Sequence, residues 1–266
     1  MSIDPSAVLH PLAVVEPGAV IGPDCRIGPF VTIGSEVTLG ARVTVKSHAV
    51  LTGWTDVGDD CVIFPFATLG EIPQDKKFHG ERTQLIIGAR NQIREHVTMN
   101  TGTEGGGGIT RVGDDGLFMA GAHVAHDCQI GNGCILVNNV ALAGHVVLED
   151  EVIVGGLSGV HQFVRIGRGA MIGAVTMVTA DVIPHGLVQG PRGVLDGLNL
   201  VGLKRRGAEK ADMTALRDLL SALKAGSFRD TARQIADAPD APQSAYVREV
   251  LAFILGPSDR SFLTPR

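Results

Sequence analysis

Aliphatic side chains recur at every sixth residue over residues 3–183 of this chain, apart from two interruptions. Twelve successive positions at this spacing, from Ile3 to Leu69, carry Ile, Leu or Val. The period returns in phase at Ile87, restarts at Val112 after a second interruption, and continues to Val178. A fixed internal period indicates a repeat architecture, in which each unit buries its apolar face by stacking on its neighbours. The repeat therefore constrains the fold before any single helix or strand is considered.

A second regular position lies four residues after each aliphatic one, where small or β-branched residues such as Ala19, Val31 and Ala49 recur. This pattern resembles the hexapeptide repeat of left-handed parallel β-helices. In that fold three six-residue segments form one triangular coil, the aliphatic residue points inward, and coils stack at a strand spacing of about 4.8 Å. The left-handed sense follows from the resemblance alone, because general crossover rules favour right-handed connections.

The composition agrees with a repetitive β-fold. Aromatic residues make up only 4% of the 266 residues, so small and aliphatic side chains must fill the core, while 35 glycines allow many tight corners. The formal net charge of −5 gives no reason to expect nucleic-acid binding. The N-terminus lacks the layout of a signal peptide, and no apolar run approaches the roughly 18 residues that span a bilayer. We expect a cytoplasmic protein without a transmembrane segment.

The four cysteines share one place in the repeat. Cys25, Cys61, Cys128 and Cys134 all lie four residues after an aliphatic position. That position points inward, so we expect core residues rather than redox centres or metal ligands, and no disulfide is predicted.

Two segments interrupt the period, and a helical pattern replaces it near the C-terminus. The interruptions, residues 71–84 and 101–111, are expected to be loops projecting from the solenoid, where function is commonly carried. The glycine run 105–108 is interpreted as a flexible spacer, because no Lys-Ser or Lys-Thr follows it. We predict a β-helix domain over residues 1–190 and a helical domain over residues 191–266, which covers the open end of the β-helix. Apolar residues at helical spacing in the second domain are Met213, Leu216, Leu219, Leu220 and Leu223, then Val247, Val250, Leu251 and Ile254.

Histidines gather at one corner of the predicted prism. His126, His145 and His161 fall at nearly equivalent places in three successive coils. Gly144 and Gln162 lie 18 and 36 residues after His126, so both stack directly above it. A metal centre is disfavoured, because the two coils between His126 and His161 separate them by about 10 Å, too far for one zinc ion.

A general base is the better interpretation of this row than solvated surface histidines. A neutral imidazole can accept a proton from a hydroxyl as that hydroxyl attacks a carbonyl, and a nearby carboxylate can orient the ring. A backbone N–H facing the base can hold the developing oxyanion. The stacked His126 and Gly144 fit these two roles.

Four motifs closely resemble the UDP-N-acetylglucosamine O-acyltransferases that begin lipid A synthesis. They are AHVAHDC at 122–128, LAGH at 142–145, VHQF at 160–163 and GLKRRG at 202–207. The resemblance covers nearly the whole chain, including IPQDKK at 72–77 in the first loop. It implies transfer of an (R)-3-hydroxyacyl group from acyl carrier protein to the 3-hydroxyl of UDP-N-acetylglucosamine, with neither a cofactor nor a metal.

The same resemblance implies roles for individual residues. His126 is the base that deprotonates the 3-hydroxyl, Asp127 supports it, and the Gly144 N–H stabilises the oxyanion derived from the thioester. Contacts with the sugar nucleotide or the acyl donor are implied for Gln74, Asp75, Lys77, His123, His145, His161 and Gln162. Contacts in the nucleotide or carrier region are implied for Asn199, Arg205 and Arg206. The competing interpretation of the cluster 204–206 is a solvated helix end whose charges favour the helix dipole.

The resemblance also implies a homotrimer with sites between neighbouring prisms, and it marks three specific positions. Ala174 lies where family members tune the acyl length by residue size. Asn100 and Arg192 each stand where the best-known members carry His, which puts part of nucleotide recognition in question. Because acyl carrier protein is acidic, a basic docking surface is expected. Its candidate residues are Arg165, Arg168, Lys204 and Arg205.

Other functions stay open on the sequence alone. The related N-acyltransferase of the same pathway normally carries an additional N-terminal domain, whereas the repeat here begins at residue 3. Acetyl-CoA-dependent hexapeptide acetyltransferases are disfavoured by the full-length match. The same transfer onto a 3-amino UDP-sugar would use much the same base and oxyanion donor. A non-catalytic hexapeptide scaffold would not need the stacked His126, Gly144 and Gln162.

Overall fold

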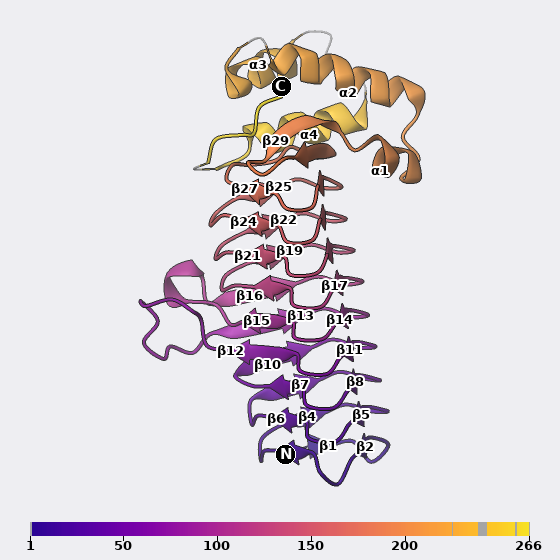
Figure 1. Ribbon diagram of the computed structural model, residues 1–266, viewed down its shortest axis with the longest axis vertical. Helices are drawn as coiled ribbons and strands as arrows, with labels where there is room; N and C mark the ends of the chain where they lie inside the picture. Colours follow the sequence, from indigo (N-terminus) through magenta and orange to yellow (C-terminus); the bar gives the residue numbers. More distant parts are fainter. Residues whose placement is uncertain (1, 225, 239–243, 259, 266) are drawn as a thin grey trace.

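Short strands stack into a tall three-sided prism, with the N-terminus at one end and helices across the other (Figure 1). The computed structural model describes residues 2–224, 226–238, 244–258 and 260–265. The prism is the predicted left-handed parallel β-helix, and a C-terminal helical part follows it. The fold prediction is confirmed.

Three sheets form the faces of the prism in the described part of the chain, and their strands are parallel except for the last one of face 2. Face 1 contains β1 (Ser2–Ile3), β4 (Val20–Ile21), β7 (Val37–Leu39), β10 (Trp54–Val57), β13 (Gln84–Ile87), β16 (Ile109–Val112), β19 (Gln129–Ile130), β22 (Val147–Leu148) and β25 (Arg165–Ile166). Face 2 contains β2 (Val8–Leu9), β5 (Arg26–Ile27), β8 (Thr44–Val45), β11 (Val62–Ile63), β14 (Gln92–Ile93), β17 (Leu117–Phe118), β20 (Ile135–Leu136), β23 (Ile153–Val154), β26 (Met171–Ile172), β28 (Gly186–Gln189) and β29 (Val194–Leu198). Face 3 contains β3 (Val14–Val15), β6 (Thr32–Ile33), β9 (Val50–Leu51), β12 (Thr68–Glu71), β15 (Thr98–Asn100), β18 (His123–Val124), β21 (Ala141–Leu142), β24 (Gly159–Val160) and β27 (Met177–Val178).

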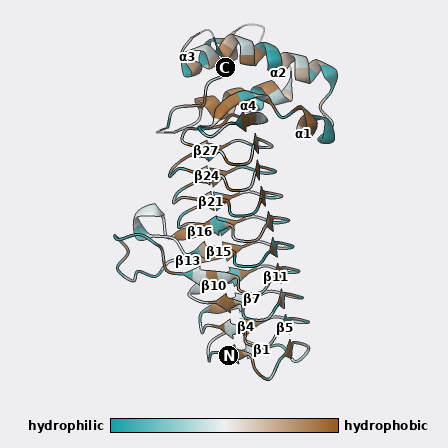
Figure 2. Ribbon diagram, in the orientation of Figure 1, coloured by the Kyte–Doolittle hydropathy of each residue, from teal (hydrophilic) through white to brown (hydrophobic). Residues whose placement is uncertain are grey.

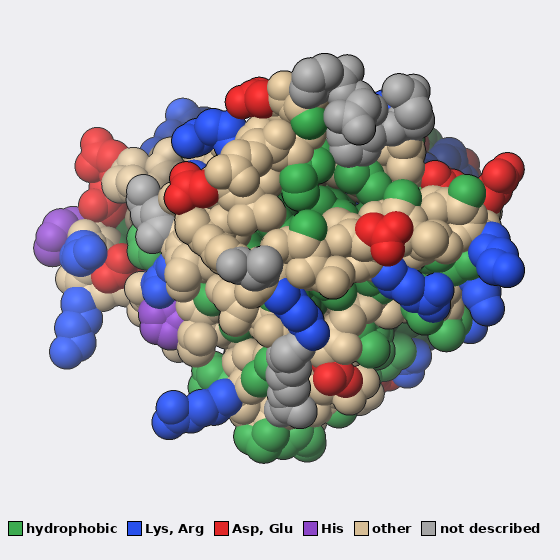
Figure 3. Space-filling view, turned by 90° about the horizontal axis from the view of Figure 1, so that it is seen from above, with side chains coloured by type: hydrophobic (Ala, Val, Ile, Leu, Met, Phe, Trp, Pro, Cys, Tyr) green, Lys and Arg blue, Asp and Glu red, His purple; other side chains and the backbone are tan. Residues whose placement is uncertain are grey.

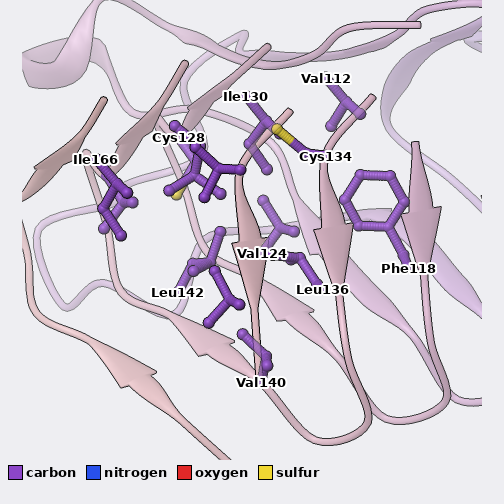
Figure 4. Packing of buried hydrophobic residues seen from close by; sticks show 14 of the residues in the cluster. Val112, Phe118, Val124, Cys128, Ile130, Cys134, Leu136, Val140, Leu142 and Ile166 are labelled. Atoms are coloured by element: carbon purple, nitrogen blue, oxygen red, sulfur yellow. The ribbon is translucent and has the colours of Figure 1, made fainter. Parts of the chain in front are cut away.

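The register of the sheets places the aliphatic repeat inside the prism. On face 3, Val124 pairs with Leu142 and Leu142 with Val160, one coil at a time. These side chains are at most 3% exposed, and Figure 4 shows Val124 and Leu142 packed in the interior with Cys128 and Cys134. The hydropathy colouring agrees, with hydrophobic segments recurring from coil to coil along the prism (Figure 2). The residue before each aliphatic one points outward, so each face carries an outer column of side chains.

The cysteines occupy the core as predicted. All four are buried and free. Burial raises the pKa of the Cys61 thiol to about 11 and those of Cys128 and Cys134 to about 12.

Most corners of the prism use the same backbone turn. The second residue after the aliphatic one, here called the second corner position, is proline at Pro5, Pro11, Pro17, Pro23, Pro29 and Pro65. Proline has no N–H, so this position contributes no donor to the strand ladder. At most corners the next residue, the third corner position, lies in the left-handed region, with φ between 57° and 64° where it is not glycine; Ser6, Leu12 and Glu36 do not have a positive φ. Asp127, His145 and Phe163 all occupy third corner positions.

Both interruptions of the repeat leave the prism at one corner. The first connects β12 to β13 and the second connects β15 to β16, so both lie where the chain passes from face 3 to face 1. Figure 1 shows the two loops projecting together from one side of the prism. They are shorter than predicted, because Glu71 and Gln84 belong to strands and residues 109–111 begin β16. The second loop contains one turn of 3₁₀-helix, Glu104–Gly106.

Four helices lie across the end of the prism in the described residues: α1 (Leu200–Arg205), α2 (Lys210–Leu223), α3 (Phe228–Ala236) and α4 (Ala245–Leu255). They cover the last coils, as predicted (Figure 1). The faces that bury Leu216 and Leu219 in α2 and Val250 in α4 are those indicated by the helical spacing. The strand β29 was not foreseen; it returns antiparallel to β28 and extends face 2 beyond the predicted boundary. That boundary, at residue 190, stays a prediction.

The C-terminal segment is tied to the prism through a buried carboxylate. Asp181 is fully buried and accepts hydrogen bonds from the Arg165 guanidinium at 2.9 Å and from the Ser258 hydroxyl at 2.7 Å. Phe262 then forms a bridge with Asp181. Among the described residues, no helix is both long and apolar enough to cross a bilayer.

Candidate active site

The histidine row lies at the corner between faces 3 and 1, just beyond the two projecting loops along the prism. Strand β18 carries His123 and leads into His126, and β21 in the next coil leads into Gly144 and His145. Register places His126 beneath Gly144, since Val124 pairs with Leu142 two residues earlier. The structure thus confirms the stacking predicted from the repeat.

His126 and Asp127 form a buried pair. The Nδ1 atom of His126 lies 2.8 Å from Oδ2 of Asp127, and the Asp127 side chain is fully buried. The left-handed backbone at Asp127 turns the chain at this point, so neighbouring residues bring their side chains together. An ionised carboxylate only accepts hydrogen bonds, so Nδ1 of His126 carries the proton. Its Nε2 atom then presents a lone pair, as a general base requires.

Thr103 in the second loop holds the same carboxylate, and sequence reasoning missed it. Its backbone N–H donates to Oδ1 of Asp127 at 2.9 Å, and its hydroxyl donates to Oδ2 at 2.6 Å. A Cβ added to Gly106 would collide with the carboxyl group of Asp127. The glycine run therefore permits close packing, and its interpretation as a flexible spacer is wrong at Gly106. No local pattern pairs Thr103 with Asp127, because the loop between the coils sets their contact.

Gly144 brings its backbone against the base. A Cβ at Gly144 would lie 2.6 Å from Nε2 of His126, so only glycine leaves room for this ring. Among the described residues, the Gly144 N–H has no hydrogen-bond acceptor in the protein. It occupies a second corner position, where the N–H takes no part in the strand ladder.

At another corner of the prism, backbone N–H groups at the equivalent second corner position bind carboxylate oxygens. Between faces 1 and 2, Ala41 donates to Oδ1 of Asp59 at 2.8 Å and Asn132 donates to Oδ1 of Asp150 at 2.6 Å, each from a second corner position to the next coil. These contacts show that the second corner position presents its N–H to a negatively charged oxygen. At Gly144 that donor is available to an oxyanion.

Aromatic rings surround the pair. His145 stacks on Phe163 with 4.3 Å between ring centroids, and its Nε2 lies 3.8 Å from Oδ2 of Asp127. The Nδ1 atom of His123 lies 2.7 Å from the hydroxyl oxygen of Thr98. Burial lowers the pKa of both His123 and His145, although Asp127 acts in the opposite direction on His145. Burial therefore favours the neutral form of these two imidazoles.

A groove with a volume of about 440 Å³ opens in front of the pair. Six of the predicted site residues line it: Gln74, His123, His126, Gly144, His161 and Gln162. Asp75 and Lys77 belong to the first loop but do not line the groove; the Lys77 backbone N–H donates to Asp75 and lowers the pKa of its carboxyl. Arg260, which sequence reasoning also missed, donates to Nδ1 of His161 at 2.9 Å.

The predicted nucleotide residues near α1 lie elsewhere in the chain. Asn199, Arg205 and Arg206 line a second, largely apolar cavity of about 630 Å³ beside strands of face 2. Asn199 accepts a hydrogen bond from the Gly202 N–H at the start of α1, and Arg206 lies 3.2 Å from the buried His185. One chain alone therefore does not bring these three residues to the groove at His126.

The predicted carrier-docking surface is only partly available. The Arg165 guanidinium pairs with the buried Asp181, and that of Arg168 pairs with Glu249 at 2.7 Å. Both guanidinium groups are thus paired with carboxylates within the chain, where they help to join the prism to the helical end. Seen from above, Lys and Arg side chains are spread among Asp and Glu rather than gathered in one patch (Figure 3). Only Lys204 and Arg205 of the four predicted residues remain as exposed candidates.

The three positions marked by the resemblance, Asn100, Arg192 and Ala174, lie in different parts of the fold. Asn100 is 3% exposed and donates to the backbone carbonyls of Glu71 and Ile72, so it fixes the start of the first loop. Arg192 forms an isolated backbone bridge with Met177. Ala174 is exposed at a corner and does not line the groove.

His126, Asp127 and His145 are close enough together for a metal ion to be considered, since their ligand atoms lie within 4.8 Å of one another. The bonding pattern fits a metal poorly. Nδ1 of His126 is used in the bond to Asp127, and both Asp127 oxygens accept hydrogen bonds from Thr103. A ligand set would have to break these contacts. The absence of a metal stays a prediction.

A three-sided prism of hexapeptide repeats, with a histidine–carboxylate pair beside an unused backbone N–H, is typical of acyltransferases of the hexapeptide-repeat class. Sequence models of two families match: "Bacterial transferase hexapeptide (six repeats)" at residues 1–35 and 18–53, and "Udp N-acetylglucosamine O-acyltransferase; Domain 2" at residues 181–263. The chain belongs to the UDP-N-acetylglucosamine O-acyltransferase family.

Close relatives and solved structures support this assignment. An acyl-[acyl-carrier-protein]–UDP-N-acetylglucosamine O-acyltransferase of Paracoccus denitrificans is 78% identical over 197 residues, which cover 74% of each chain. One of Agrobacterium fabrum is 47% identical and covers 82% of this chain and 81% of its own. The solved UDP-N-acetylglucosamine acyltransferase from Campylobacter jejuni superposes with a TM-score of 0.90 at 36% identity, covering 97% of this chain and 100% of that one.

Proposed function

We propose that the chain transfers an (R)-3-hydroxyacyl group from acyl carrier protein to the 3-hydroxyl of UDP-N-acetylglucosamine, the reaction that begins lipid A synthesis. One observation carries the mechanism: the lone-pair nitrogen of His126 and the Gly144 N–H converge on the same groove. The names of the closely similar relatives supply the donor and the acceptor.

In this mechanism Nε2 of His126 takes the proton of the sugar 3-hydroxyl, and the oxygen attacks the thioester carbonyl. The negative charge moves to the carbonyl oxygen, where the Gly144 N–H stabilises it. Collapse of this intermediate forms the ester and expels the carrier thiolate, which takes the proton back from His126. Asp127 keeps the proton of His126 on Nδ1 and stabilises the imidazolium. Because the thioester is already activated, no cofactor is required.

The remaining groove residues suit a sugar nucleotide and an acyl donor. Gln74 from the first loop and His123 lie at one end, where they can hold sugar hydroxyls. His161 and Gln162 lie at the other end, and Arg260 adds positive charge beside His161, which favours a phosphate. Lys77 and His145 are close by, and we assign them supporting contacts with the substrates.

We further propose that a homotrimer completes the site. Asn199 and Arg205 lie away from His126 within one chain, so they can contact the same substrate only across a subunit boundary. Co-assembly of two inactive variants, His126→Ala and Arg205→Ala, tests this directly. Mixed trimers should recover up to about a quarter of native activity. At random assembly from equal amounts, about a quarter of the sites combine an intact His126 from one subunit with an intact Arg205 from its neighbour. Mixtures as inactive as their parents would contradict the shared site.

The reaction itself is tested by acyl transfer from a panel of (R)-3-hydroxyacyl carrier proteins to UDP-N-acetylglucosamine. We expect product esterified at the 3-hydroxyl, and a loss of at least 100-fold in kcat for His126→Ala. His10→Ala, which removes an exposed histidine in the first coil, is the matched control and should keep native activity. Full activity of His126→Ala would refute the base assignment. Transfer only to a 3-amino UDP-sugar would replace the acceptor, and no transfer at all would favour a scaffold.

A cytoplasmic location is part of the proposal, because the acyl carrier donor acts there. Fractionation of cells that express the native protein should recover it with cytoplasmic markers. Recovery with the membrane fraction in the presence of salt would contradict this location.

A further inference from the structure

Two imidazoles of the histidine row have Nδ1 atoms with opposite partners. Nδ1 of His126 lies 2.8 Å from a carboxylate oxygen of Asp127, and an ionised carboxylate only accepts hydrogen bonds. Nδ1 of His161 lies 2.9 Å from Nη2 of Arg260, and a guanidinium only donates them. A neutral His161 therefore accepts at Nδ1 and carries its proton on Nε2, which is the reverse of the arrangement in His126.

One other contact at Nδ1 of His161 acts in the opposite direction. The carbonyl oxygen of Gln162 lies 3.4 Å from this nitrogen and can accept a proton placed on it. That distance exceeds the usual range of about 2.7–3.2 Å for an N–H···O hydrogen bond. The contact with Arg260, at 2.9 Å, is shorter and comes from a charged donor, which makes it the stronger of the two. Arg260 therefore determines which nitrogen of His161 carries the proton.

The C-terminal segment places Arg260 at this end of the groove. The Arg260 backbone N–H donates to the Ser258 hydroxyl oxygen at 3.0 Å, and the Ser258 hydroxyl donates to the buried carboxylate of Asp181 at 2.7 Å. On the other side of Arg260, the carbonyl of Ser261 accepts from the Asp181 N–H at 2.8 Å, and the N–H of Leu263 donates to the Asp181 carbonyl at 2.9 Å. Residues on both sides of Arg260 are thus bound to one fully buried aspartate.

Arg260 also supplies a positive charge that no carboxylate neutralises. In the part of the chain that the structure describes, no salt bridge involves Arg260. His161 lines the groove beside it, and within the same described residues Nε2 of His161 has no hydrogen-bond partner. A guanidinium next to an imidazole N–H suits a phosphate group, because ionised phosphate oxygens only accept hydrogen bonds.

We propose that Arg260 is a positioning residue that keeps the proton of His161 on Nε2, so that His161 donates a hydrogen bond to a phosphate group bound at this end of the groove. This inference rests on the proposed function, in which both substrates carry phosphate: a diphosphate in the sugar nucleotide and a phosphodiester in the prosthetic arm of the carrier. The row then combines two opposite tautomers. His126 presents a lone pair to the reacting hydroxyl, and His161 presents an N–H to the substrate that is being held.

The tautomer can be tested without substrate, by NMR of the protein labelled with ¹⁵N in its histidine rings. At about pH 8 a histidine with the ordinary pKa of about 6.5 is neutral, and the ¹⁵N shift distinguishes a protonated ring nitrogen from an unprotonated one. We expect the proton on Nε2 in His161 and on Nδ1 in His126, with signals assigned from their loss in His161→Gln and His126→Ala. In Arg260→Met the proton of His161 should move towards Nδ1, where the Gln162 carbonyl is the remaining partner, while His126 stays unchanged.

Steady-state kinetics connect the tautomer to substrate binding. Arg260→Met should raise KM for the substrate that supplies the phosphate by about tenfold or more, with kcat within about threefold, because the contact lies away from the reacting atoms. The rise should affect either the sugar nucleotide or the acyl carrier, and this identifies the source of the phosphate. Arg26→Met, which removes an exposed arginine from face 2 in the N-terminal coils, is the matched control and should keep native KM values.

A double-mutant cycle separates positioning from the effect of charge alone. The side-chain amide of His161→Gln extends to the place of Nε2 and keeps an N–H donor that needs no partner at Nδ1. If Arg260 acts through the tautomer, Arg260→Met should raise KM at least about threefold less in the His161→Gln background than in the native one. Equal increases in the two backgrounds would mean that Arg260 contributes charge only, and the positioning role would be wrong.

Three further results would overturn the proposal: a native His161 protonated on Nδ1, a tautomer that survives Arg260→Met, or unchanged KM values for both substrates in that variant. If no acyl transfer occurs with any donor, the proposed function fails separately. The NMR spectra and the dissociation constants of the two substrates, measured on the same variants, then decide the role of Arg260, with the same differences expected.

Discussion

Replacing Thr103 with valine removes one hydroxyl from the carboxylate that supports His126 and changes little else. Valine keeps the shape of threonine and the backbone N–H that donates to Oδ1 of Asp127. Only the 2.6 Å hydrogen bond from the Thr103 hydroxyl to Oδ2 is lost. That oxygen is also the one that accepts from Nδ1 of His126.

The size of the effect can be bounded from these contacts. A hydrogen bond to a charged group contributes about 1.5–3 kcal/mol, and a loss of about 1.4 kcal/mol in transition-state stabilisation lowers a rate tenfold. Two of the three donors to the Asp127 carboxylate remain, so we expect kcat to fall about 10- to 100-fold. Asp127→Asn, which removes the charge, should cost more, on the order of 10⁴-fold as in other histidine–carboxylate pairs.

Steady-state kinetics with both substrates varied measure this effect. Thr103 touches Asp127 rather than the groove, so KM for each substrate should stay within about twofold, while kcat falls. Thr103→Ser keeps the hydroxyl and is the matched control, with near-native kcat expected. A native kcat for Thr103→Val, or a loss confined to KM, would refute the assigned positioning role.

Three further predictions follow from other contacts. Gly144→Ala should lower kcat by at least 100-fold with an unchanged circular dichroism spectrum, because its Cβ would displace His126; an active variant would contradict the stacked geometry. Burial lowers the pKa of His123 from 6.5, so the unfolded chain binds more protons than the folded chain as the pH falls. The melting temperature should therefore fall on acidification from pH 7 to 5, and it should fall less steeply in His123→Gln. Identical slopes of melting temperature against pH in the two proteins would contradict this. Asp181→Ala strands the Arg165 charge and should destabilise the protein by about 3–5 kcal/mol in denaturant unfolding, whereas a change below 1 kcal/mol would show that the pair is not structural.

The prism and the stacking of its site could be predicted from the sequence, because the period fixes which residues share a face. Once Val124, Leu142 and Val160 are placed inward, the positions of His126 and Gly144 follow by counting. The same logic placed the cysteines in the core.

Contacts made by the loops and by the helical end could not be predicted from the repeat period. Thr103 reaches Asp127 through a loop with no repeat, and Arg260 reaches His161 across 99 positions of the sequence. The pairing of Arg165 with Asp181 depends on how the C-terminal segment folds back. A count of charges therefore assigned Arg165 to a docking surface, although the fold uses it internally.

The second corner position has a consequence for how such proteins can change. Where the second corner position is not proline, its N–H stays outside the strand ladder; in this chain some of these donors bind aspartate side chains from the next coil, while that of Gly144 has no acceptor among the described residues. A catalytic centre of this kind therefore needs only one histidine, one glycine eighteen residues later, and no aspartate side chain in the next coil that would occupy the N–H of that glycine. Because non-proline second corner positions recur in many coils, a few surface substitutions would place a similar centre in another coil without changing the core.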